Sequence, residues 1–168
     1  MLHGFRNRLE KILEGVTVGL MVGLAIVVIL GVTFRKAGAA LVWYDEVASI
    51  LLAWLTFYGA ALAALKRAHI GFPTLVESLP VGPRKALVVL SEVLVIGFFL
   101  VVTWAGWQVF LILQGETLVS LPWLPQRVVH SVIPVGAILF IVAELLSFPE
   151  LLRFPEARPD VPSQESAS

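Results

Sequence analysis

Four long apolar runs constrain this chain more than any other feature of its sequence. They cover about residues 15–34, 47–65, 86–113 and 128–148. Crossing the hydrocarbon core of a bilayer takes roughly 20 mostly apolar residues in a helix, and each run comes close to or exceeds that length. A helix satisfies its own backbone groups in lipid, whereas barrel strands alternate over about ten residues. The runs therefore predict an all-α membrane protein with four transmembrane helices.

The composition narrows the class further. Hydrophobic residues make up 58% of the chain and charged residues 14%, there is no cysteine, and the mean hydropathy is +0.92. These values exclude a disordered protein, a disulfide-stapled domain and a cysteine-ligated metal site. Basic and acidic residues both number 12, so no bulk charge attracts nucleic acid. The chain is therefore expected to lie in a lipid bilayer and not to bind nucleic acid.

The domain organisation follows from the same runs. Residues 1–154 are expected to form a single four-helix membrane domain, and residues 155–168, which are rich in proline and serine, a disordered cytoplasmic tail. Before the first run, apolar residues fall near a 3.6-residue period. That pattern fits either a short amphipathic helix at the membrane interface or a helical extension of the first span. The short loops 35–46 and 114–127 are expected at the other membrane interface, on the side opposite the N-terminal segment.

The order of the charges predicts the orientation. With four spans, both termini lie on the same side as the second loop. That side carries nine of the 12 basic residues, Arg6, Arg8, Lys11, Lys66, Arg67, Arg84, Lys85, Arg153 and Arg158. The other side carries Arg35, Lys36 and Arg127. The positive-inside rule therefore places both termini in the cytoplasm.

Gly15, Gly19 and Gly23 recur every four residues in the first run. Small residues at this spacing let another helix approach closely, so the stripe is expected to be a packing face. The plainer interpretation is that glycine is simply frequent in membrane helices.

Charged residues of both signs flank the first outer loop. Arg35 and Lys36 close the first run, and Asp45 and Glu46 open the second. Acidic residues at a helix N-terminus are favoured by the helix dipole, which accounts for them structurally. The alternative is that the four residues form a periplasmic docking surface for an outer partner.

Glu92 and Glu144 are the acidic residues nearest the middle of the apolar runs. A carboxylate inside a membrane is a functional candidate. Both nevertheless lie one or two turns from the cytoplasmic face, where Lys85 and Arg153 are within reach. Interfacial charge pairs are therefore favoured over a proton relay.

No pattern in the sequence supports catalysis or a cofactor. His69 and His130 fall on opposite sides of the membrane, about 30 Å apart, so they cannot share one haem iron. The sequence contains neither a HExxH zinc motif nor a P-loop. We expect no catalytic residue, no bound metal and no cofactor. The chain is therefore expected to be a helper, a membrane bundle that holds or positions another component.

The segment Trp43–Phe72 carries a resemblance to a known family. It contains Trp43 and Glu46, then Trp54-Leu55, Gly59-Ala60-Ala61, Lys66-Arg67 and His69-Ile70; a second match is Ile133-Pro134-Val135-Gly136. In these residues, and over about residues 10–150, the chain resembles the small membrane subunit of tripartite ATP-independent periplasmic (TRAP) transporters, the DctQ-like family. Pro73 departs from the family pattern, in which a polar residue is expected.

The resemblance implies a role in transport. The small subunit would anchor a large membrane subunit, which holds the substrate and sodium sites. It would also help dock a periplasmic binding protein that delivers an organic anion, often a carboxylate. Trp54 and Gly59 would then join the glycine stripe as candidates for helix packing or the partner interface. The location implied is the bacterial inner membrane.

Two other interpretations remain open. One is a membrane anchor of a respiratory or redox complex, which would show a haem absorbance. The other is a stand-alone small transporter, which would transport without partners.

Overall fold

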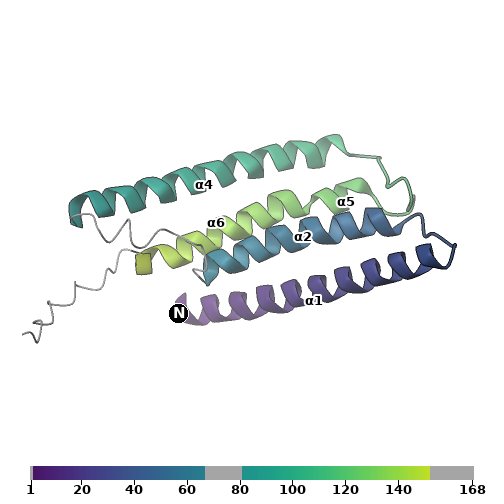
Figure 1. The fold of residues 1–168 in the computed structure, drawn as a ribbon. Coiled ribbons are helices and arrows are strands. Elements are labelled where there is room, and N and C mark those ends of the chain that lie inside the picture. Colours follow the sequence, from purple (N-terminus) through teal and green to yellow (C-terminus); the bar gives the residue numbers. More distant parts are fainter. Residues whose placement is uncertain (1, 67–80, 152–168) are drawn as a thin grey trace, which may run out of the picture.

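The computed structural model describes residues 2–66 and 81–151. The helices are α1 (Leu2–Lys36), α2 (Tyr44–Leu65), α4 (Val81–Ile112), α5 (Gln126–His130) and α6 (Val132–Leu151), as Figure 1 shows. Over these two described ranges, four segments are long and apolar enough to cross a membrane. The prediction of four membrane-spanning helices is confirmed. The predicted tail 155–168, and His69 and Arg153, lie outside the described residues.

The first helix settles the choice left open for the N-terminal segment. α1 is one continuous helix of 35 residues, so the apolar pattern before residue 15 is an extension of the first span and not a separate interfacial helix. At 1.5 Å per residue α1 is about 52 Å long, well beyond a hydrocarbon core of about 30 Å. Part of α1 therefore lies outside the hydrocarbon core or the helix is tilted.

The fourth predicted span is interrupted. Instead of one helix over 128–148, the structure has α5 and then α6, with Ser131 between them. Pro134 has no backbone N–H, so the carbonyl four residues before it loses its helical partner. The Ser131 hydroxyl and backbone N–H both donate to the carbonyl of Val128, at 2.6 and 3.3 Å, in a tighter turn.

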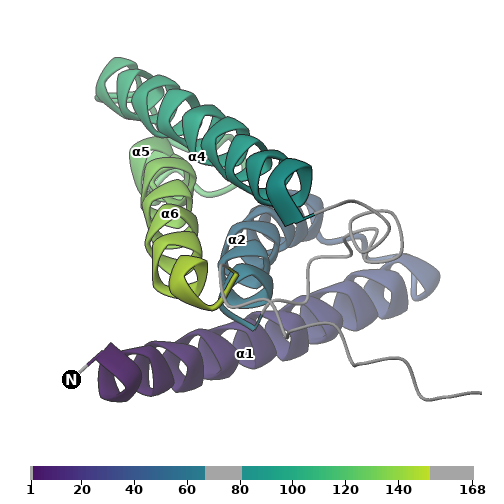
Figure 2. The same ribbon diagram turned by 90° about the vertical axis from the view of Figure 1, so that its left-hand side faces the viewer.

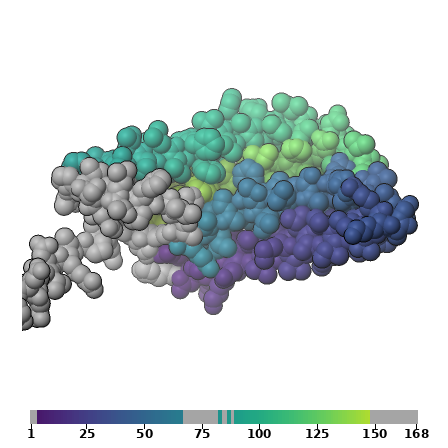
Figure 3. All heavy atoms as spheres, viewed as in Figure 1, coloured from purple at the N-terminus to yellow at the C-terminus, as the bar shows by residue number. Residues whose placement is uncertain are grey.

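The helices pack in the order α1, α2, α6, α4, each chiefly against its neighbours in that row. Figure 2 shows α2 and α6 side by side between α4 and α1. On the face seen in Figure 3, α2 and α6 come to the surface between the two outer helices. The helices thus form an open row, in which α1 and α4 each have one side without a neighbouring helix from the described part of the chain.

Along the helix axes, the bundle has two ends, which differ in what they carry. The terminal end is where α1 begins and where α2 and α6 end; the loop end carries residues 37–43 and 113–125 (Figure 1). The buried core lies toward the terminal end and joins α1, α2 and α6. It consists of Leu13, Ala61, Ala64, Leu65, Phe140 and Ala143. Small alanines on α2 allow close approach of the neighbouring helices.

Large apolar side chains on the outer helices are widely exposed. Ile12 and Ile29 on α1 are 62% and 63% exposed, and Trp104 on α4 is 65% exposed. In water such a surface would be unfavourable, but in a bilayer it faces lipid or another membrane helix. The exposure therefore agrees with the membrane assignment.

Candidate functional site

At the loop end, the charged residues at the α1–α2 junction form a small cluster. The guanidinium of Arg35 donates to the Tyr44 hydroxyl, lies 5.2 Å from the centre of the Tyr44 ring and is 3.7 Å from the Asp45 carboxylate. The Arg35 and Asp45 side chains are 63% and 73% exposed, so this ion pair contributes little stability. Lys36 is exposed at the end of α1.

Glu46, the next residue of α2, binds the loop before α5. Its carboxylate accepts hydrogen bonds from the backbone N–H of Val119, at 3.3 Å, from the backbone N–H of Ser120, at 2.9 Å, and from the Ser120 hydroxyl. Three donors on one carboxylate are a strong, charge-assisted arrangement. Glu46 therefore fastens this loop to α2, a role that its position beside Asp45 did not indicate.

The loop itself is closed by backbone hydrogen bonds. Leu118 N–H donates to the Leu124 carbonyl at 3.1 Å, and Gln126 N–H donates to the Glu116 carbonyl at 3.0 Å. The Leu118 side chain is buried under it, whereas Val119 and Trp123 are 90% and 75% exposed. The loop end thus offers a shaped surface with exposed apolar residues and exposed charges.

Within the described ranges, no helix packs against the glycine stripe on α1. A Cβ added at Gly15, Gly19 or Gly23 would meet no atom within 4 Å. The residues of α1 that turn toward α2 include buried Leu13 and Gly31, which are five helical turns apart. Gly15 is two residues from Leu13, about 200° around the helix. Gly15 and Gly19 are exposed and therefore lie on the side of α1 away from α2, where a partner could reach them, whereas the half-buried Gly23 lies nearer to α2.

Three other glycines are the tightly packed ones, and the sequence did not single them out for close packing. A Cβ at Gly31 would collide with the Tyr44 ring, one at Gly106 with Ile133 and Pro134, and one at Gly136 with Phe57. In each case the glycine lies on one helix, and the side chain for which it leaves room lies on another helix. A spacing rule applied within one helix could not reveal them.

Trp54 makes its polar contact within the chain. Its indole Nε1–H donates to the Val129 carbonyl at 3.0 Å, close to the interruption between α5 and α6. Its ring lies 6.1 Å from that of Tyr58. Trp54 thus ties α2 to α5, while a Cβ at Gly59 would meet nothing within 4 Å.

Glu92 and Glu144 lie on the packed faces of α4 and α6. Each is only 9% exposed. Phe99 of α4 and Phe140 of α6 stack with their ring centres 3.8 Å apart. Glu92 is seven residues before Phe99 and Glu144 is four after Phe140, so both belong to the same seam. The structure does not describe the side chain of Lys85, nor Arg153. The expected charge pairs of Glu92 with Lys85 and of Glu144 with Arg153 therefore stay a prediction.

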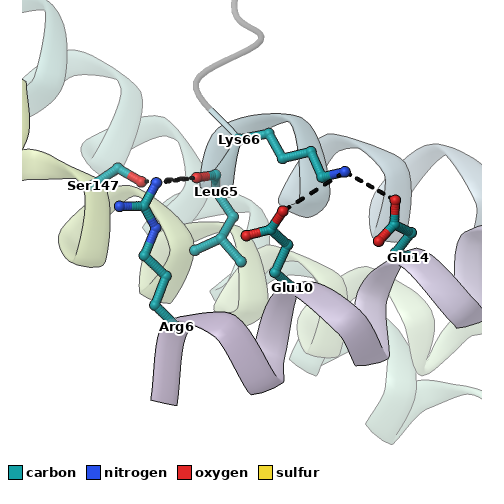
Figure 4. A network of polar contacts seen from close by, with 6 residues as sticks. All are labelled: Arg6, Glu10, Glu14, Leu65, Lys66 and Ser147. Carbon is teal, nitrogen blue, oxygen red and sulfur yellow. Dashed lines mark hydrogen bonds and ion pairs between the residues drawn. The ribbon is translucent and has the colours of Figure 1, made fainter. Parts of the chain in front are cut away.

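The terminal end holds a polar network from three helices, drawn in Figure 4. Arg6 of α1 donates to the Leu65 carbonyl at 3.1 Å, and the buried Ser147 hydroxyl of α6 lies 3.3 and 3.5 Å from the Ala64 and Leu65 carbonyls. The last carbonyls of a helix lack intrahelical donors. Arg6 and Ser147 therefore cap the end of α2.

Lys66 completes this network. Its ammonium lies 3.0 Å from the Glu14 carboxylate and 3.7 Å from that of Glu10 (Figure 4). The hydrogen bond with Glu14 is the main reason that the pKa of Lys66 is raised above its ordinary value of 10.5. A raised lysine pKa adds stability below the ordinary value, and that contribution is lost as the pH rises through the folded-state pKa. The contact is intact at neutral pH.

No arrangement among the described residues resembles a catalytic centre. Residues 2–66 and 81–151 contain no group of three or more histidines and acidic residues placed to hold a metal ion. What the geometry offers is a set of contacts between helices, two polar ends and uncovered helix faces. These features define a multi-pass α-helical membrane protein.

Comparison with known families identifies the family of membrane proteins to which the chain belongs. The family model described as "Tripartite ATP-independent periplasmic transporters, DctQ component" matches residues 24–154. The match covers most of the chain, and the chain therefore belongs to the DctQ family, the small permease component of TRAP transporters. A search of curated proteins found no match. The resemblance read from Trp43–Phe72 is thereby confirmed.

Proposed function

We propose that this subunit acts as a non-catalytic scaffold in the bacterial inner membrane. It holds the large TRAP membrane subunit and helps dock the periplasmic binding protein for sodium-gradient-driven uptake of an organic anion, of which a carboxylate is the favoured class. Both termini face the cytoplasm, so the loop end faces the periplasm. The charge order along the chain supports this orientation.

The observation that carries the scaffold role is the uncovered side of α1. The glycine stripe is open there and exposed apolar side chains surround it. Transmembrane helices associate through small residues that let backbones approach closely. A helix of the large subunit is the partner proposed for this face.

Pull-down of the tagged chain from its host in mild detergent tests this role. A multi-span partner should co-purify without a haem absorbance. Gly19→Leu places a bulky side chain on the open stripe and should reduce the large subunit recovered, whereas Val28→Leu, at an exposed position of the same helix, should not. Normal recovery and normal transport with Gly19→Leu would contradict the proposal for this face, and a haem band would favour a redox anchor.

The docking role is tested by charge reversal. Lys36→Glu and Asp45→Lys change exposed side chains at the loop end. They should weaken uptake that depends on the binding protein, with assembly unchanged. Reversal at Arg35 should behave in the same way, whereas Glu46→Lys should also disturb the loop that Glu46 fastens. Unchanged uptake in all four variants would rule out a docking role for these residues.

A further inference from the structure

A groove opens at the loop end between α2, the loop before α5 and the start of α6. Its volume is about 400 Å³, which lies within the range of about 300–1,000 Å³ typical of small-molecule sites. Apolar side chains form most of its wall. They include Ile50, Ala53 and Phe57 from α2, Leu118 from the loop, and Val132 and Ile133 from α6.

The polar residues of the groove come from the first turns of α2 and from α5. The Glu46 carboxylate is one of them. Gln126 uses its amide N–H toward the Thr117 carbonyl, at 3.4 Å, which leaves its Oε1 as an acceptor. His130 Nδ1 lies 3.0 Å from the Gln126 carbonyl. Because a carbonyl only accepts, Nδ1 is the protonated nitrogen in this contact, and in that tautomer Nε2 is an acceptor.

The groove is therefore acceptor-rich at one end and apolar along the rest. No lysine or arginine is among the described residues that line it. From Glu46 to Phe57 the groove follows α2 for about 17 Å, that is, from the end of the span to beyond the middle of a hydrocarbon core of about 30 Å. A ligand that matches has an apolar chain and a cationic hydrogen-bond donor at its polar end.

We propose that the groove binds one phospholipid with a primary-amine headgroup. One acyl chain lies along Ile50, Ala53 and Phe57, and the ammonium group is held near Glu46, Gln126 and His130. The charge of the polar end selects this occupant over an anionic phospholipid. The lipid site rests on the proposed function in one respect only: the proposed orientation of the chain places this lipid in the outer leaflet.

Photocrosslinking tests the proposal on the complex purified through a tag on this chain. The complex is placed in nanodiscs of equal parts phosphatidylethanolamine and phosphatidylglycerol, with a trace of either lipid carrying a photoreactive acyl chain. Crosslinks should concentrate in residues 49–57 and 129–133, with about threefold more from phosphatidylethanolamine, the ratio expected for one weakly screened ion pair. Crosslinks spread evenly over α1 and α4, equal labelling by the two lipids, or a protein chain in the groove would overturn it.

A matched pair of variants sharpens the result. Ala53→Phe fills the groove from α2, and Ala105→Phe adds the same bulk at an exposed position of α4 outside it. The first should abolish most crosslinking in residues 129–133, and the second should leave it intact. Because crosslinks are mapped on this chain, they remain readable if no large subunit co-purifies. Failure of the scaffold proposal is thus distinguishable from failure of this one.

Discussion

At the scale of single residues, Glu46 shows how a side chain acquires its role from a distant partner. Its hydrogen-bond donors at Ser120 are 74 residues further along the chain. Hydrogen bonds to a charged acceptor are stronger than neutral ones. The single carboxylate therefore holds a loop whose own contacts are mostly backbone hydrogen bonds and one buried leucine.

Glu46→Gln should loosen this loop. The amide keeps the size of the side chain but loses the charge, and its NH2 group replaces one of the two acceptor oxygens, so that it faces either the Val119 N–H or the two donors of Ser120. Hydrogen–deuterium exchange should become faster in residues 116–125 while exchange in α2 stays slow. Glu116→Gln, which removes an exposed carboxylate from the same loop, is the control. Equal exchange in both variants would contradict the fastening role.

Trp54 provides a second test at this scale. Trp54→Phe keeps an aromatic ring and removes the donor to the Val129 carbonyl. The expected loss of stability is about 1 kcal/mol, the usual size for one hydrogen bond, with values in membranes toward the lower end. Thermal unfolding in detergent measures it against Trp104→Phe, at an exposed ring of α4. A smaller loss for Trp54→Phe than for the control would argue against the bond.

At the scale of the helix, α1 has two faces that use glycine differently. The face toward α2 contains Gly31, which leaves room for the Tyr44 ring, whereas Gly15 and Gly19 of the stripe are exposed on the side away from α2. Gly31→Ala should destabilise the isolated subunit by about 1–3 kcal/mol through overpacking. Gly19→Ala should leave it unchanged or slightly more stable, because alanine favours the helix.

Thermal unfolding of the two alanine variants compares these faces directly. The same midpoint for Gly31→Ala and the wild type would mean that Tyr44 moves aside without cost. A clear loss for Gly19→Ala in the isolated subunit would show that the stripe already packs within the chain.

The sequence predicted the number of membrane-spanning helices, because span length and apolar content are local properties, but α1 and α4 begin earlier than the apolar runs 15–34 and 86–113. The observed α2 begins three residues before the predicted run and ends at the same residue, Leu65. The interruption at Ser131 was missed, although Pro134 gives a local signal for it. The apolar length alone treated 128–148 as one helix, and Pro134, in the second turn of that run, was not used to divide it.

At the scale of the whole molecule, the order α1, α2, α6, α4 could not be read from the chain. Which glycines are crowded, which carbonyl Trp54 reaches and what Glu46 holds all depend on that order. The sequence could therefore indicate candidate residues, but not the groups that they contact in the fold. The open row also explains why so much apolar surface remains on α1 and α4: each of these outer helices has one side without a neighbouring helix from the described residues, and in a membrane that side faces lipid or another helix.

The orientation of the row decides which end meets the binding protein, and a labelling experiment measures it. The chain has no cysteine, so single-cysteine variants need no background removal. Ala39→Cys lies in the loop between α1 and α2, and Ser166→Cys lies near the C-terminus. In spheroplasts a membrane-impermeant maleimide should label Ala39→Cys at once and Ser166→Cys only after permeabilisation, because basic residues are retained on the cytoplasmic side. Labelling in the reverse order would place the loop end in the cytoplasm. The charged cluster and Glu46 would then be unable to meet a periplasmic partner, and the docking proposal would fall while the scaffold proposal remained.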